Sequence, residues 1–362
     1  MSFGIIEAID RLRGDMRIDK RNRNPYRIVL TGKDYSELVY FSCPIYSETT
    51  KKIIRKEWKK TKEGFIFEGV NAVVQVEKDS IFLKNAAGIC KITFSEAVQV
   101  EPSMNGIFVE SDNAKIEVKL EFNITGNVVS NSNYFGLIKE GQIPFFVFNG
   151  LYGKNKDKLS PLEIENKKLS NTKYVVRLKG NKDYEKICFD MNLYLPKFIF
   201  DTTVSSKKRS ENNVYGEIAF LGITEECGEE WLYARMDLQK LSDINVAQII
   251  LAEYYLPTYN STQENLKMNI LYLPWCSFGA TWENKNDSAR AMRYSQNLYN
   301  YKKLEVTDVI KKLLKIDDPR NISVLIRQEA KFGCTAVATG DNYSMPQILR
   351  IKIKGDISNG KN

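Results

Sequence analysis

The chain has 362 residues, with 53 Lys and Arg residues, 45 Asp and Glu residues and a formal net charge of +8. It contains no histidine, which excludes the Ser-His-Asp and Cys-His nucleophile pairs, histidine-ligated metals and the commonest general base near neutral pH. The length favours two domains, each large enough to bury a core without disulfides or metals.

Residues 1–24 are expected to form an amphipathic arm with a short helix. Apolar residues recur at helical spacing at Phe3, Ile5, Ile6, Ile9 and Leu12. A stripe this short is not stable alone, so we expect it to dock on a neighbouring subunit. The segment lacks the features of a secretory signal, and no window approaches about 18 uninterrupted apolar residues. We therefore expect synthesis in the cytosol, no membrane span, and a final location in a particle or at a cell or spore surface.

A basic stretch follows in the sequence KKIIRKEWKKTK. Its cations are Lys51, Lys52, Arg55, Lys56, Lys59, Lys60 and Lys62. They would attract a polyanion such as a nucleic acid or an acidic glycan. No aromatic-interleaved nucleic-acid motif accompanies them, which favours a solvated hairpin and argues against nucleic acid as the partner.

The dominant period of the sequence is two. KIEVKLEF (115–122) alternates apolar and charged residues, and QILRIKIK (347–354) does the same, as half-buried antiparallel strands do. Further short apolar segments between turn residues predict strands at 27–32, 37–43, 64–69, 71–77, 89–94, 106–110, 144–149, 173–179, 186–195, 245–256, 267–273 and 322–328. The fold class is therefore expected to be all-β, with two antiparallel β-sandwich or jelly-roll-like domains.

One segment has helical spacing. Val306, Ile310, Leu313 and Leu314 predict a short helix within 306–315, with Thr307 or Asp308 able to cap it. A change to extended and then polar sequence near 196–206 suggests a domain boundary. The expected order is the arm over 1–24, a β-rich domain over 25–197, a β-sandwich over 198–355 and a polar tail over 356–362.

The six cysteines are widely separated and form no CxxC motif, which argues against zinc and redox-dithiol sites. The acidic segment TEECGEE (224–230) lacks the spacing of a calcium loop, so a solvated loop is favoured. Glu253, Asp237 and Asp341 are possible glycosidase carboxylates, but sequence spacing does not give their separation. We expect no catalytic residues, no metal and no cofactor.

From residue 198 onward, a series of segments carries a resemblance to a known family. They are FDTTVSS (200–206), NNVYG (212–216), LYARMDLQKLSDINVAQIILAEYYLP (232–257), LYLPWCSFGATWEN (271–284), LEVTDVIKKLL (304–314) and MPQILRIKI (345–353). In this order they resemble the DNRLRE-type β-sandwich modules, which are jelly-roll-like and similar to carbohydrate-binding modules. The resemblance covers residues 198–354, and the six-residue string that names the family is missing. It implies an appended module of surface, adhesive or polysaccharide-handling proteins, some of which bind acidic glycans.

Aromatic faces can stack on sugar rings, and cations can pair with glycan carboxylates. Candidate ligand residues of these two kinds are Trp231, Tyr254, Tyr255, Arg235, Arg290 and Arg293. The leading hypothesis is a non-catalytic structural or adhesive subunit of a phage-like, spore-like or cell-surface assembly, acting as a homo-oligomer or with other subunits. An acidic-glycan-binding module and a histidine-free polysaccharide-acting enzyme are the alternatives.

Overall fold

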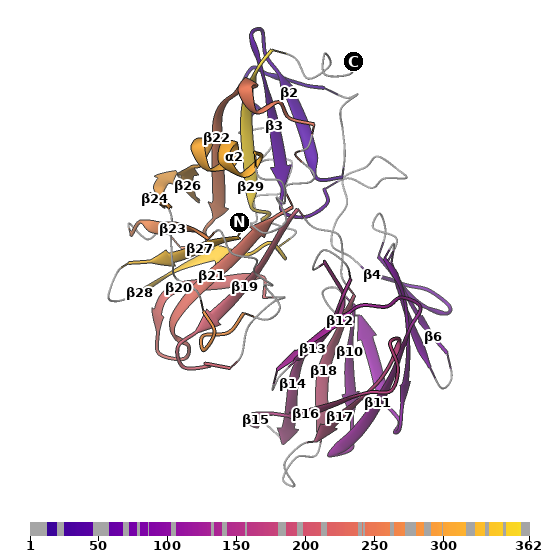
Figure 1. Cartoon of the computed structure of the whole chain (residues 1–362). Coiled ribbons are helices and arrows are strands. Elements are labelled where there is room, and N and C mark those ends of the chain that lie inside the picture. The colour runs from indigo at the N-terminus through magenta and orange to yellow at the C-terminus, as the bar shows by residue number, and fades with distance from the viewer. Residues whose placement is uncertain are drawn as a thin grey trace. The chain divides into compact units, whose positions relative to one another are not determined.

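A computed structural model describes most of the chain (Figure 1). The described residues are 13–19, 25–45, 58–67, 72–77, 80–85, 87–102, 106–131, 134–139, 143–155, 158–179, 186–193, 198–210, 216–237, 241, 243–260, 264–271, 280–285, 291–298, 300–315, 323–329, 333–342 and 345–355.

The chain forms two compact units, and the second is inserted into the first. Unit 1 comprises Met1–Arg55 and Pro196–Asn362, and unit 2 comprises Lys56–Leu195. The prediction of one domain over 25–197 therefore needs correction, because residues 25–45 belong to unit 1. The physical reason is a long-range strand pairing: Tyr35–Phe41 pairs residue for residue with Ile348–Lys354 near the other end of the chain.

Unit 1 contains two antiparallel sheets of seven strands each. Sheet I runs in the order β1 (Arg17–Ile18), β2 (Arg27–Thr31), β3 (Tyr35–Phe41), β29 (Ile348–Lys354), β22 (Ile249–Pro257), β26 (Tyr301–Glu305) and β25 (Gln296–Leu298). Sheet II runs in the order β24 (Ala291–Tyr294), β23 (Leu266–Leu271), β27 (Ser323–Gln328), β21 (Gly228–Met236), β20 (Ile218–Thr224) and β28 (Gly333–Ala338), and β19 (Ile199–Ser205) also pairs with β21.

Unit 2 also contains two antiparallel sheets. Sheet III has eight strands in the order β16 (Glu163–Lys168), β17 (Lys173–Lys179), β11 (Lys115–Phe122), β8 (Gly88–Phe94), β7 (Ile81–Asn85), β6 (Ala72–Val76), β5 (Gly64–Phe67) and β4 (Trp58–Lys60). Sheet IV has seven strands, namely β12 (Asn127–Asn131), β13 (Tyr134–Lys139), β14 (Ile143–Asn155), β18 (Lys186–Leu193), β10 (Gly106–Ser111) and β9 (Gln99–Pro102), with β15 (Lys158–Pro161) beside β14.

Each unit has one large hydrophobic cluster to which both of its sheets contribute. In unit 1, Leu38 and Tyr254 of sheet I belong to the same cluster as Leu232 and Ile326 of sheet II. In unit 2, the cluster joins the inward residues of β11 to those of β10, β14 and β18. The strand 115–122 alternates between buried and more exposed residues as predicted, and so do residues 349–354, whereas Gln347 and Ile348 are both buried. The all-β, antiparallel class is confirmed.

The predicted helix at 306–315 is present as α2 (Thr307–Leu313), but its cap is not the predicted one. The N-cap residue is Val306, whose side chain makes no capping hydrogen bond, and the Thr307 hydroxyl accepts a hydrogen bond from the backbone N–H of Ala252 on β22, at 2.9 Å. A second short helix, the 3₁₀ turn η2 (Val246–Gln248), precedes β22. None of the helices in the described ranges is long and apolar enough to cross a membrane.

Most of the predicted N-terminal arm lies outside the described residues, including all of its apolar stripe, and so does the tail over 356–362. Within the arm, Arg17–Ile18 is described as a strand and pairs with β2. Met16 and Ile18 pack against a cluster on sheet I that includes Ile28 and Phe41.

The ends of unit 1 that lead to the insertion are held together. The backbone N–H of Phe198 donates to the Ser42 carbonyl at 2.8 Å, and the Ser42 hydroxyl accepts from the Gln347 N–H at 3.1 Å. The Gln347 side chain donates to Asp201 at 3.0 Å and accepts from the hydroxyl of Tyr254. This buried network ties sheet I to β19 of sheet II where the chain leaves and re-enters unit 1.

Candidate binding sites

Sheet I is unusual because it carries apolar side chains on both faces. One face contributes Val29, Leu38 and Ile351 to the main cluster of unit 1. The opposite face, called here the outer face, carries a second buried cluster that contains Ile28, Leu30, Val39, Phe41, Ile45, Tyr255 and Ile348. Along β3, β29 and β22 this outer face changes from apolar to charged, because the next outward positions are Glu37, Arg350, Lys352 and Glu253.

A cavity of about 240 Å³ lies at the charged end of the outer face. It is lined by Tyr35, Glu37, Leu251, Glu253, Arg350 and Lys352. Ligand pockets for drug-sized molecules are usually larger, about 300–1,000 Å³. The cavity therefore suits a ligand about the size of one sugar ring or a small organic acid.

Arg350 and Glu253 organise the polar side of this cavity. The Arg350 Nε donates to Glu37 at 2.6 Å, and Glu253 accepts from the Tyr255 hydroxyl at 2.7 Å and from Lys303 Nζ at 3.0 Å. Burial alone would raise the pKa of Glu253, but the hydrogen bonds from Tyr255 and Lys303 outweigh it and lower that pKa. Both carboxylates, Glu37 and Glu253, are therefore already occupied by donors of the chain.

Lys352 is different, because its charge has no carboxylate partner among the described residues. Its Nζ lies 3.5 Å from the centre of the Tyr35 ring, a cation–π contact. Glu37 lies directly opposite Lys352 in the strand register, yet its carboxylate is bound to Arg350. The cavity consequently presents one ammonium group beside an aromatic ring, together with two carboxylates that are already bound by donors of the chain.

The predicted ligand residues do not converge on one site. Tyr254 and Tyr255 are neighbours on β22, so they point to opposite faces of sheet I: Tyr254 belongs to the core and Tyr255 to the outer-face cluster. Arg293 on β24 forms an ion pair with Asp308 of α2. Arg235 is partly buried on β21, and Arg290 lies outside the described residues.

Trp231 lies in a further aromatic cluster of unit 1. Its ring centre is 4.8 Å from that of Trp282, and the two side chains belong to a small buried cluster with Val204, Tyr233, Ala280 and Leu325. Lys285 Nζ lies 4.5 Å from the centre of the Trp282 ring, and Arg327 lies over Trp231 at 5.2 Å. Cations of the chain itself thus cover these rings, and Trp231 is only 4% exposed.

The structure describes part of the predicted basic stretch. Lys59 and Lys60 lie on β4 and are exposed, as is Lys62 in the turn that follows. Lys51, Lys52, Arg55 and Lys56 lie outside the described residues.

Sequence reasoning did not assign the cavity. The available signal is that Arg350 and Lys352 occupy outward positions of the half-buried strand predicted over 347–354. Their neighbours Tyr35 and Glu37 come from β3, and Glu37 is 313 residues away from Arg350 in the sequence. No local pattern reveals that pairing.

The two edge strands β24 and β25 form a second candidate surface. They are consecutive in the sequence, and they lie at the ends of sheets II and I, respectively. Met292 is 49% exposed, Tyr294 is 53% exposed and Leu298 is 38% exposed. Apolar side chains on an open sheet edge are a typical site for strand addition by another chain.

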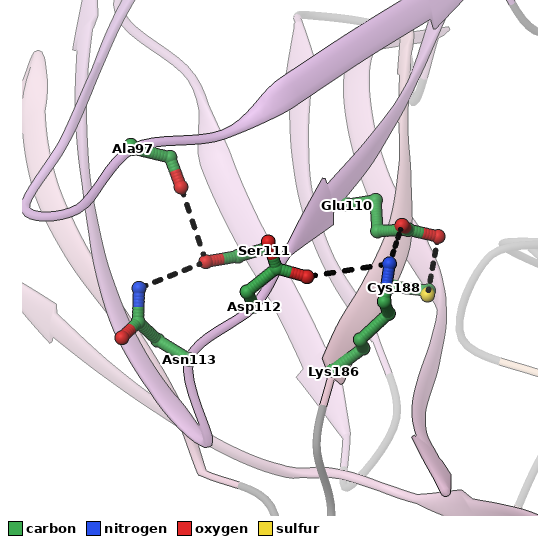
Figure 2. Close-up of polar contacts among 7 residues, drawn as sticks. All are labelled: Ala97, Glu110, Ser111, Asp112, Asn113, Lys186 and Cys188. Atoms are coloured by element: carbon green, nitrogen blue, oxygen red, sulfur yellow. Dashed lines mark hydrogen bonds and ion pairs between the residues drawn. The ribbon is translucent and has the colours of Figure 1, made fainter. Parts of the chain in front are cut away.

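A polar cluster on sheet IV of unit 2 has a structural explanation. Figure 2 shows Lys186 of β18 between Glu110 and Asp112, with the Nζ at 2.6 Å from Glu110 and 3.2 Å from Asp112. The Cys188 thiol donates to the other oxygen of Glu110 at 3.7 Å. These contacts cross-link β10 and β18, which pair in register. Across the described ranges, no group of three or more Cys, Asp or Glu residues is arranged to hold a metal ion.

Comparison of the chain with models of known protein families gives no match, and comparison with curated proteins gives none either. The likeness of residues 198–354 to DNRLRE-type modules therefore stays a proposal based on the segments quoted above.

Proposed function

We propose that the chain is a non-catalytic structural subunit of an assembled particle or surface layer, in which copies associate through the β24–β25 edge. The observation that carries this proposal is the exposure of Met292, Tyr294 and Leu298 on strands that end both sheets of unit 1. Pairing with a second copy would bury these side chains and satisfy edge backbone groups that have no strand partner among the described residues.

The edge strand β16 of sheet III in unit 2 supports this proposal, because its composition differs from that of the β24–β25 edge. The edge strand β16 has the sequence EIENKK, and five of its six side chains are exposed. Charged side chains on an edge strand prevent pairing with other chains. The chain thus protects the β16 edge with charged side chains, whereas the β24–β25 edge exposes Met292, Tyr294 and Leu298.

We also propose that each unit is a jelly-roll-like sandwich. Two sheets that share one core in each unit fit a pair of jelly-roll-like sandwiches, and unit 1 holds all the segments that resemble DNRLRE-type modules. Modules of that kind are appended to surface and adhesive proteins, which agrees with a role in assembly.

The test is the mass of the full-length protein in solution, measured by size-exclusion chromatography with light scattering across a range of concentrations. Wild type should form dimers or larger species, and Met292→Lys with Tyr294→Lys should shift them to monomers. Leu169→Lys, at a residue that is 56% exposed in unit 2, is the matched control and should leave the mass unchanged. A wild-type monomer at every concentration would refute the proposal.

Acidic-glycan binding is the second candidate, and the sheet I cavity favours it. The Lys352 ammonium can pair with one ligand carboxylate, while Tyr35 offers an aromatic face and the cavity holds about one sugar ring. Calorimetric titration with glucuronate should show binding that Lys352→Gln abolishes, and glucose should not bind. Equal binding of both sugars would contradict a site for a carboxylate. A polysaccharide-acting enzyme remains a prediction that no feature of the described residues favours.

A further inference from the structure

The outer face of sheet III in unit 2 is strongly basic. Along β7, β8, β11 and β17 the side chains that point away from the core alternate with buried ones, as their burial patterns show. The outward cations on these four strands are Lys84, Lys91, Lys115, Lys119, Lys173, Arg177 and Lys179, and the outward anions are Glu117 and Glu121.

The strand register arranges four of these cations in a diagonal line. Lys84 lies opposite Ile89, two residues before Lys91 on β8. Lys91 lies opposite Glu121, two residues from Lys119 on β11.

The same step repeats on the last strand of the line. Lys119 lies opposite Val175, two residues before Arg177 on β17. Each step moves one strand across the sheet and two residues along it, which places successive Cα atoms about 8 Å apart.

Three members of this line have no acidic partner. Arg177 is bound to Glu117 at 3.0 Å, and Glu121 is bound to Lys173 at 3.2 Å. Within the described part of the chain, Lys84, Lys91 and Lys119 form no ion pair, and all three are exposed. The diagonal therefore keeps three cations that are not in ion pairs, and the carboxylate of Glu121, directly opposite Lys91, is bound to Lys173.

Two further pairs of positions extend the charge beyond this line. At one end, Lys179 of β17 lies directly opposite Lys115 of β11 on one side and directly opposite Glu163 of the edge strand β16 on the other. At the other end, the registers of β4 to β7 place Lys59 in the same cross-strand row as Lys84. Part of the basic stretch found in the sequence thus continues onto this face.

We propose that the outer face of sheet III binds a linear anionic polysaccharide, with Lys84, Lys91 and Lys119 as the central contacts. A row of exposed cations across a sheet can contact a polymer that carries negative charges at regular intervals. Each such contact releases a counterion, which favours binding at low salt. The surface lies in the inserted unit and is independent of both the β24–β25 edge and the cavity in unit 1.

A polysaccharide fits this face better than a single-stranded nucleic acid. Proteins that bind single strands on a sheet stack the bases on exposed aromatic rings. On these four strands the outward aromatic residue is Phe82, and its ring already has Lys91 over it, with the Nζ 5.5 Å from the ring centre. Charge pairing is therefore available on this face, but base stacking is not.

The test uses the full-length protein and a triple variant, Lys84→Gln, Lys91→Gln and Lys119→Gln. Binding is measured by biolayer interferometry against immobilised polygalacturonate, dextran and single-stranded poly-dT at several salt concentrations. Wild type should bind polygalacturonate with an affinity that falls steeply as salt rises, and the triple variant should bind at least about tenfold more weakly with a flatter salt dependence.

The control removes the same charge from unit 1, through Lys33→Gln, Lys312→Gln and Lys315→Gln at three exposed positions. This control should keep the affinity of wild type, and circular dichroism should show that both variants fold. An equal loss in the two triple variants, tighter binding of poly-dT than of polygalacturonate, or no binding of any polymer would overturn the proposal. The assembly proposal is tested by the mass in solution, which the β24–β25 edge variants should change and the Lys→Gln variants should not. A failure to bind polysaccharide would therefore leave the assembly proposal untouched.

Discussion

At the scale of single residues, Glu230 shows how burial decides the behaviour of a carboxylate. The sequence predicts a solvated loop over the acidic segment 224–230, and Glu225 and Glu226 are exposed. Glu230, in contrast, is 6% exposed and accepts a hydrogen bond from the Phe220 N–H at 2.7 Å. Burial raises its pKa above the ordinary 4.5, and the hydrogen bond opposes that rise without cancelling it.

The raised pKa of Glu230 predicts that the free energy of unfolding of the protein depends on pH. Because the folded-state pKa is raised, the contribution of Glu230 to stability is fully present below pH 4.5 and is lost as pH rises through the folded-state pKa. Glu230→Gln keeps a hydrogen-bond acceptor and removes the buried charge. We expect it to raise the free energy of unfolding at pH 8 by about 1 kcal/mol and to give no gain at pH 4.

Urea denaturation at the two pH values measures this difference. Glu225→Gln, on the exposed part of the same turn, should have no effect at either pH. A gain from Glu230→Gln that is equal at pH 4 and pH 8 would show that shape, and not charge, is responsible.

At the scale of elements, the strands with one solvated face were predictable and the pairing between strands was not. β11 and most of β29 alternate because one face meets water, so their side chains could be assigned to faces from the sequence. β2 and β3 are buried on both faces, so they lack that alternation. The place of β3 beside β29 depends on contacts across some 300 residues, and the cavity that includes Glu37 and Arg350 depends on the same contacts.

The junction between α2 and β22 shows a second limit of local reasoning. β22 shifts register against β29 between Ile249 and Leu251, which leaves Ile250 half exposed as in a β-bulge. Beyond this irregularity, Ala252 accepts a hydrogen bond from the Val306 N–H and donates its own N–H to the Thr307 hydroxyl. A residue expected to cap the helix instead continues the hydrogen bonding of the strand.

Thr307→Val should therefore destabilise the strand more than the helix. The substitution keeps the shape of the side chain but leaves the Ala252 N–H without its acceptor, at an expected cost of about 1–2 kcal/mol. Thr307→Ser keeps the hydroxyl and should restore most of the stability. Hydrogen exchange measured by mass spectrometry should show faster exchange in β22 for Thr307→Val. Faster exchange confined to α2 would mean that Thr307 acts as a helix cap after all.

At the scale of the whole molecule, the insertion of unit 2 changes which part of the chain can fold alone. A fragment of residues 198–355, the domain expected from the sequence, lacks β1, β2 and β3. It would expose the edge of β29 and remove Val29, Leu38 and Tyr40 from the core of unit 1. In the intact chain, the hydrogen bond from Phe198 to Ser42 brings the two ends of the insertion together.

These contacts predict opposite outcomes for two proteins. Residues 1–45 joined to 198–362 by about six Gly and Ser residues should fold and unfold in one cooperative transition, because the linker has only a short gap to span. Residues 198–355 alone should aggregate or bind a hydrophobic dye, since an unpaired apolar strand edge and an incomplete core would face water. Thermal unfolding followed by circular dichroism distinguishes them. Cooperative folding of 198–355 alone would mean that β2 and β3 are dispensable to unit 1, and a linked protein that fails to fold would mean that unit 1 depends on its insertion.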